Sequence, residues 1–164
     1  MNGESLGKQE NTADKKNTLV WEVPYAHGIL KAVSYNKGGE VGTATLESAG
    51  KVEKIRLSAD RTEIVADGND LSYITLELVD SKGIRNQLAE ELVEFSIAGD
   101  ATIEGVGNAN PMSIESFVAN SRKTWRGSNL LVVRSGKSSG RIIVTAKVKA
   151  LPVASITTFS YTHL

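Results

Sequence analysis

"GRIIVTAKVKA", residues 140–150, indicates the class of fold, because its apolar side chains recur at every second position. On an extended chain one face would carry Ile142, Val144, Ala146 and Val148. The other face would carry Ile143, Thr145, Lys147 and Lys149, so it becomes more polar toward its end. Successive side chains of a strand point to opposite faces. One apolar and one wetter face therefore predict a strand of an antiparallel sheet with one solvated side.

Other stretches show the same strand periodicity. "LSYITLELVD" (71–80) and "LVEFSIAG" (92–99) both alternate between apolar and polar side chains. Their inward residues would be Ile74, Leu76 and Leu78 in the first, and Val93, Phe95 and Ile97 in the second. "NLLVVRS" (129–135) is instead a continuous apolar run, which predicts a strand covered on both sides.

Turn-forming segments separate these strands at 36–39, 66–70, 80–83 and 135–140. They combine Asp, Asn, Ser and Gly, which tolerate bent or left-handed backbone. Because the spacing between turns is short, the sequence predicts an all-β sandwich rather than alternating strands and helices.

The chain also divides near residue 50. Residues 1–49 would form strands near Leu19–Tyr25, Ile29–Tyr35 and Val41–Glu47. These are too few to cover both faces of a sandwich, so 1–49 is interpreted as part of a second small β-sandwich domain. Residues 50–54 would be a linker. Residues 55–164 match the size of a complete immunoglobulin-like antiparallel β-sandwich, about 100 residues.

Composition excludes several functions. Nineteen basic and nineteen acidic side chains cancel, so no net field attracts nucleic acid or an anionic membrane. There is no cysteine and only two histidines, His27 and His163, which cannot supply the three or four ligands of a zinc site. No apolar run approaches the roughly 20 residues that span a bilayer. Residues 1–16 lack the apolar core of a secretory signal. We expect no cofactor, metal, nucleic acid or membrane partner.

Two ordered sets of motifs resemble the C-terminal region of glycoside hydrolase family 2, the family of β-galactosidase-type enzymes. The first set is Asn2, Gly3, Ser5, Leu6, Gly7, Trp21, Val23, Pro24, Tyr25, Gly28, Leu30, Ala32 and Tyr35. The second includes "VEFSIAGDATIEGVGNANP" (93–111) and "GRIIVTAKVKAL" (140–151), and resembles the immunoglobulin-like domain that closes such enzymes. One departure is Ala109, where the family pattern has glycine.

The resemblance implies that the chain is a fragment without catalytic residues. Family 2 enzymes are retaining hydrolases whose two glutamates lie in an upstream barrel, and no position here matches their motifs. The family also has a strand before "NGESLG" (2–7) that is missing here. The expected partners are therefore the upstream domains of the same polypeptide. Export of the parent to the periplasm or the medium fits an enzyme of this type, although the fragment itself does not assign its compartment.

"TIEGVGNANP" (102–111) raises the question of phosphate binding, because Gly105 and Gly107 follow a strand-like run. A dinucleotide fingerprint needs a third glycine and a helix. Asn110 and Pro111 stand there instead, so the glycines are predicted to allow a bulge or tight bend. "DGND" (67–70) has too few oxygens for the roughly six to eight of a calcium site, and predicts a turn.

Trp125 is the aromatic residue most open to a binding role. It is flanked by Arg122, Lys123 and Arg126, which favours a partly exposed ring. One interpretation is that the ring covers the end of the sandwich, with the aliphatic parts of the arginine side chains packed on it. A second is that the ring is a platform for weak carbohydrate contact. A third is that the positive charges beside the ring bind acidic groups of a neighbouring domain. Trp125, Arg122 and Arg126 are the candidate contact residues.

Three functions remain open from the sequence. The first is a non-catalytic accessory module of a family 2 hydrolase, the second a carbohydrate-binding module, and the third a bacterial immunoglobulin-like adhesin repeat. The third requires a sister repeat, and residues 1–50 do not repeat the pattern of 55–105. Truncation of the first domain would leave unpaired strand edges. This predicts either disorder of about the first dozen residues or an edge-to-edge homodimer.

Overall fold

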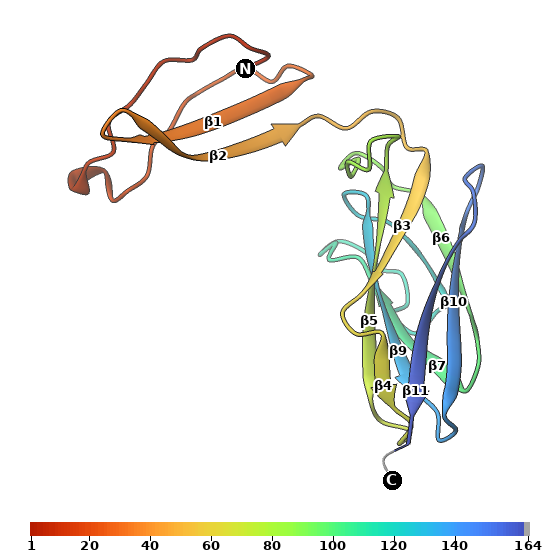
Figure 1. The fold of residues 1–164 in the computed structure, drawn as a ribbon. Helices are drawn as coiled ribbons and strands as arrows, with labels where there is room; N and C mark the ends of the chain where they lie inside the picture. Colours follow the sequence, from red (N-terminus) through yellow and green to blue (C-terminus); the bar gives the residue numbers. More distant parts are fainter. Residues whose placement is uncertain (163–164) are drawn as a thin grey trace. The chain divides into compact units, whose positions relative to one another are not determined.

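The computed structural model describes residues 1–162, which form two compact units, unit 1 (residues 1–48) and unit 2 (residues 49–162) (Figure 1). Strands dominate both units, and one 3-10 turn, η1 (Ala13–Lys15), precedes them. In the part of the chain that the structure describes, no helix is long and apolar enough to cross a membrane.

Unit 1 is built on a β-hairpin. Strand β1 (Ile29–Asn36) pairs antiparallel with β2 (Gly39–Glu47). Lys37 and Gly38 connect them with φ of +48° and +83°, the two positive φ angles of a type I′ turn, whose twist matches that of the strands. The Asn2 side chain fastens the N-terminal segment to the hairpin, because its Oδ1 accepts from the Ile29 N–H at 2.7 Å.

The predicted strand at Leu19–Tyr25 is wrong, because that segment pairs with no neighbouring strand. Trp21 is accordingly 41% exposed and not in a core. A segment with the alternation of residues 19–25 becomes a half-buried strand only if a neighbouring strand pairs with it and another layer covers it. Among residues 1–48, β1 and β2 pair only with each other. Both strands thus keep one open edge, and the edge-to-edge homodimer stays a prediction.

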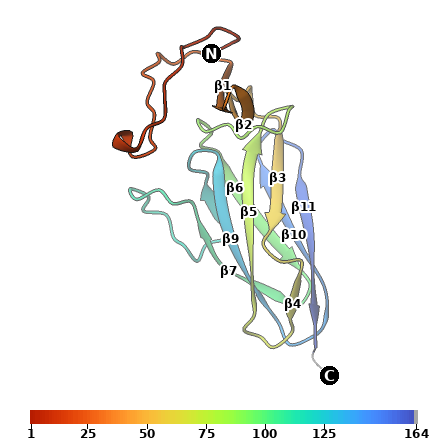
Figure 2. The ribbon, with the colours of Figure 1, turned by 60° about the vertical axis from the view of Figure 1, so that its left-hand side comes forward.

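Unit 2 is a two-layered sandwich, which confirms the all-β prediction (Figures 1 and 2). One sheet has the order β4 (Glu63–Val65), β11 (Ala154–Tyr161), β10 (Gly140–Val148), β6 (Leu92–Ala98), β8 (Ser121–Lys123). The other has the order β3 (Lys54–Ala59), β5 (Leu71–Val79), β9 (Ser128–Ser135), β7 (Ala101–Gly107). All pairs are antiparallel except β4 with β11, which is parallel.

The core lies between these sheets and follows the alternation of the sequence. The inward residues of β10 (Ile142, Val144, Ala146 and Val148) are all buried, as predicted. So are Ile74, Leu76 and Leu78 of β5, and Val93 and Phe95 of β6, with Ile97 packed against them. Burial of each of these Val, Leu, Ile and Phe side chains contributes about 1.5–3 kcal/mol, so this apolar layer is the main stabilising term of unit 2.

Strand β9 differs from its prediction. Leu131 and Val133 are buried, but Leu130 is 40% exposed, so the strand is covered on one side rather than both. It lies in the interior of its sheet between β5 and β7, and among the described residues of unit 2 no further sheet lies on its outer face. A continuous apolar run therefore cannot by itself distinguish a strand buried on both faces from an interior strand with one open face.

The glycine-rich second half of β7 contains a bulge, as predicted. Ile103 pairs with Val133 and Gly105 with Val132, so Glu104 is the extra residue of a β-bulge. A side chain at Gly105 would place its Cβ 3.1 Å from the Phe117 carbonyl oxygen. Glycine at this position thus permits the close approach of the Phe117 backbone.

Candidate functional surface around Trp125

Trp125 begins a tight turn between β8 and β9. The N–H groups of Trp125 and Ser128 each donate to the carbonyl of the other residue at 3.1 Å. Arg126 and Gly127 between them have φ of +50° and +71°, so this is a type I′ turn. The sequence reasoning missed it, because Arg-Gly lacks the Asn or Asp that usually marks such turns.

Neighbouring backbone fixes this turn in place. The Gly127 N–H donates to the Ala89 carbonyl at 3.0 Å, and its carbonyl accepts from the Leu78 N–H at 2.9 Å. The Trp125 ring is partly exposed, while Arg126 is exposed with its guanidinium carbon 5.7 Å from the ring centroid. Trp125 and Arg126 therefore form a small, rigid surface in which a cation covers one face of the ring.

Arg122 does not belong to that surface, so this part of the sequence prediction is wrong. Its side chain has no exposed area. Its guanidinium donates to the carbonyls of Val106 at 3.3 Å and Glu115 at 3.1 Å, and to Ser113 Oγ at 3.1 Å. Side chains of adjacent strand residues point to opposite faces. Arg122 thus points inward beside the exposed Lys123.

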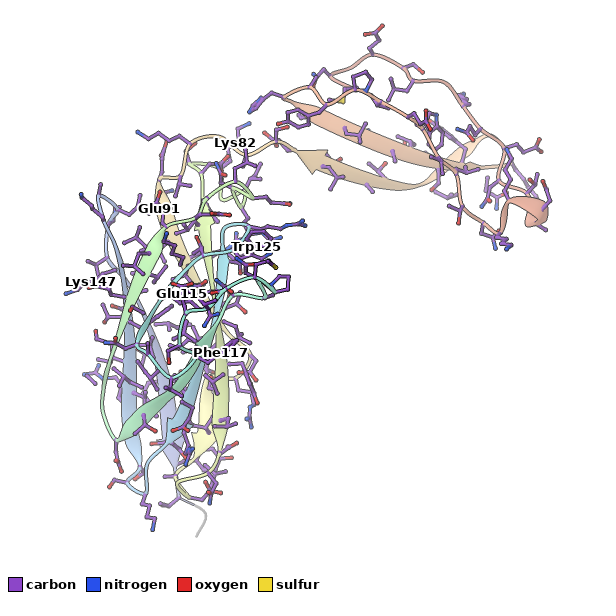
Figure 3. All side chains as sticks on the ribbon, turned by 180° about the vertical axis from the view of Figure 1, so that it is seen from behind. Lys82, Glu91, Glu115, Phe117, Trp125 and Lys147 are labelled. Atoms are coloured by element: carbon purple, nitrogen blue, oxygen red, sulfur yellow. The ribbon has the colours of Figure 1, made fainter. Side chains whose placement is uncertain are left out.

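Arg122 and its neighbours hold the long β7–β8 loop, residues 108–120. Phe117 stacks on Arg122, whose guanidinium carbon lies 4.2 Å from the ring centroid. Glu115 Oε1 accepts from the Lys123 N–H at 3.0 Å, and Asn108 donates to the Lys123 carbonyl at 2.8 Å. Figure 3 shows Glu115 and Phe117 on this loop, with Trp125 on the turn that follows β8. The loop is therefore fastened to β8 by its own polar side chains.

The same loop exposes a group of large apolar side chains, which we call the apolar loop. They are Met112 (84% exposed), Ile114 (101%), Phe117 (62%) and Val118 (80%). The sequence analysis did not single them out. The signal was present in "PMSIESFVAN" (111–120), where apolar residues follow a proline without the period of a strand or helix.

Several acidic residues of unit 2 hold turns and loops by accepting hydrogen bonds from backbone N–H groups. The N–H of Asn69 lowers the pKa of Asp67, and the N–H of Val65 lowers the pKa of Asp70. Hydrogen bonding to backbone N–H favours the charged carboxylate. The segment "DGND" (67–70) is accordingly a turn in which the Asp67 carboxylate accepts from the N–H groups of Asn69 and Asp70.

Three more carboxyl groups show the same effect. The backbone N–H of Gly50 donates to Asp80 and lowers its pKa. In the same way, the N–H of Ser138 lowers the pKa of Asp100. The N–H of Lys123 lowers the pKa of Glu115. Asp80 is buried, and it also accepts from the N–H groups of Lys82 and Ile84 at 3.0 and 2.9 Å. Within residues 1–162, no group of three or more metal-ligating side chains is placed to hold an ion.

An open depression of about 710 Å³ lies at the β5–β6 and β10–β11 connections. Its lining includes Glu53 and Glu91, but also Lys51 and Lys149, and Figure 3 labels Glu91. Charges of both signs thus line it together with apolar side chains such as Leu88.

Comparison with known proteins agrees with this architecture. Residues 55–157 match the glycoside hydrolase family 2 C-terminal domain 5, and residues 1–42 match a domain of unknown function, DUF4982. A beta-galactosidase of Bacteroides ovatus is 34% identical over 92% of this chain and 18% of its own length. A putative beta-glucuronidase of Formosa agariphila is 27% identical over all of this chain and 16% of its own length.

Solved structures give the same result. A glycosyl hydrolase family 2 member from Bacteroides cellulosilyticus superposes with a TM-score of 0.95 at 95% identity, over 99% of this chain and 21% of that chain. The present chain therefore spans about a fifth of the length of these relatives. The domain match covers most of the sandwich, and the chain belongs to glycoside hydrolase family 2, as part of its C-terminal region.

Proposed function

We propose that this chain is a non-catalytic accessory module of a glycoside hydrolase, which packs against and spaces the other domains of the enzyme. The observation that carries the proposal is the match of residues 55–157 to the C-terminal domain 5 of glycoside hydrolase family 2, and the chemistry of the carboxyl groups supports it. A retaining glycosidase needs a general acid of raised pKa and a second carboxylate about 5–5.5 Å away. In the described residues, each carboxyl whose pKa is displaced has it lowered by backbone N–H groups.

The relatives support a parent that hydrolyses β-glycosides. Those from Bacteroides ovatus and Thermoanaerobacter pseudethanolicus are named beta-galactosidases, at 34% and 32% identity. The two from Formosa agariphila are named as beta-glucuronidases, one of them putative. A β-galactoside is accordingly the first substrate to test on the parent, and a β-glucuronide the second.

The test compares the parent enzyme with this chain alone on nitrophenyl β-galactoside and β-glucuronide. We expect turnover by the parent on one of them and none by the chain, with circular dichroism showing that the chain is folded. Turnover by the folded chain at a rate comparable with the parent would overturn the proposal.

Carbohydrate binding is a second candidate, favoured by the rigid and partly exposed Trp125 ring. Sugars stack on such rings, but the guanidinium of Arg126 lies over one face, so that face is not free for a sugar. Affinity electrophoresis in several polysaccharides tests this, with Trp125→Ala as the comparison. Retardation that disappears in the variant would support binding, and unchanged mobility in every gel would remove it.

A further inference from the structure

We infer that the apolar loop (Met112, Ile114, Phe117 and Val118) is the surface by which the sandwich docks on the remainder of its parent hydrolase; the inference rests on the module function proposed above. Large apolar side chains that are scattered singly on a surface are ordinary, but a contiguous group marks an interaction site. Here four of them occur within seven residues, exposed by 62–101%.

Contacts within unit 2 hold the apolar loop in one conformation without any partner. Arg122, without exposed area, ties it to the sandwich through Glu115, Ser113 and the Phe117 ring. Asn110 adds a local turn, because its Oδ1 accepts from the Met112 N–H at 2.9 Å. A loop already fixed in one conformation loses little entropy on binding, which favours its use as an interface.

The chemistry of the loop favours protein as the occupant. Ile114, Val118 and Met112 offer aliphatic surface without polar groups, whereas sugar sites need hydrogen-bonding groups beside an aromatic ring. Between residues 108 and 120 the only charged residue is Glu115, so the loop lacks the Lys and Arg residues that draw a segment to an anionic membrane surface.

The remainder of the parent is the protein that fits best. This chain spans 15–22% of the length of the two relatives named as beta-galactosidases and of the two solved Bacteroides cellulosilyticus structures. About four fifths of such an enzyme thus lies outside the chain, covalently linked and at high effective concentration. Under that condition even a small apolar contact forms without strong intrinsic affinity.

The test measures thiol accessibility in the full-length parent enzyme. This chain contains no cysteine, so Ile114→Cys introduces a probe at the most exposed position of the loop. Val153→Cys is the matched control, because Val153 is also a β-branched residue, is 57% exposed, and lies on the β10–β11 connection. Labelling by a maleimide is followed by mass spectrometry of the peptide that contains each site.

We expect Ile114→Cys to react at least about tenfold more slowly than Val153→Cys in the folded enzyme, and equally fast once both are denatured. The slow rate should persist on hundredfold dilution, because the contact is within one polypeptide. Equal rates in the folded enzyme would overturn the inference, and so would protection lost on dilution, which would identify a second copy as the occupant. Neither outcome bears on the turnover test above, so failure of this inference leaves the proposed function standing.

Discussion

Replacing Arg122 by methionine should destabilise unit 2 by about 3 kcal/mol. The guanidinium makes three hydrogen bonds in a fully buried position, to Val106, Glu115 and Ser113. With a charged donor each contributes about 1.5 kcal/mol at the lower end, or about 4.5 kcal/mol together. The buried Nε has no partner within the described residues, and its removal recovers about 1.5 kcal/mol. Methionine fills much of the volume, so the cavity cost is small.

Chemical denaturation of the wild-type and variant chains measures this difference, with Arg141→Met as the control. Arg141 is exposed on β10, and its substitution should change stability by less than about 0.5 kcal/mol. In Arg122→Met, hydrogen exchange of residues 108–120 should also accelerate, because the loop loses its fastening to β8. A variant as stable as wild type, with unchanged exchange in this loop, would refute the view that Arg122 holds it. Buried ionic groups can sometimes be replaced by apolar ones without loss, which is the physical alternative that this experiment decides.

Three further predictions concern the backbone and pH. Ala109→Gly should stabilise unit 2 by about 0.5 kcal/mol, because Ala109 has φ of +59° and left-handed backbone strains a residue with a Cβ. The control Ala98→Gly, in β6, should destabilise unit 2 by a similar amount. Denaturant midpoints that shift in the same direction in both variants would contradict this prediction. Gly99→Ala should prevent stable folding or lower the melting temperature strongly, because the new Cβ would lie 2.4 Å from the Arg141 carbonyl oxygen. A melting temperature within a few degrees of that of the wild type would contradict this prediction and show that the β6–β7 turn can shift. Folding lowers the pKa of five carboxyl groups, those of Asp67, Asp70, Asp80, Asp100 and Glu115, so the stability that they contribute is present above their unfolded pKa of about 4 and is lost as the pH falls through their folded pKa values. The melting temperature should therefore decrease once the pH falls below about 4, and it should decrease less steeply in Asp80→Asn. A melting temperature that stays constant down to about pH 3 would contradict this prediction.

The alternation of "GRIIVTAKVKA" (140–150) was enough to predict the sandwich, because a strand with one apolar face can bury it only against another layer. The same reasoning failed for Leu19–Tyr25, which has the residues of a strand but no neighbour to pair with. Pairing is a property of two segments, and no pattern within one of them reports it. Trp21 in this segment is accordingly 41% exposed, although a paired and covered strand would bury such a ring.

The candidate surface shows a similar limit at the level of single residues. The sequence places Arg122, Trp125 and Arg126 close together, and charge alone suggested a shared exposed surface. In the structure the pleat of β8 turns Arg122 inward, where it fastens a loop that the sequence pattern did not distinguish.

The apolar pattern was enough to predict layered strands and the inward side chains of β5, β6 and β10, because burial of apolar area in a strand follows a local period of two. The pairing of the strands, the burial of Arg122 and the exposure of the apolar loop became visible only in the folded chain. Those outcomes depend on contacts between residues far apart in the chain, such as Gly127 with Leu78 and Ala89, and local propensity contains no information about them.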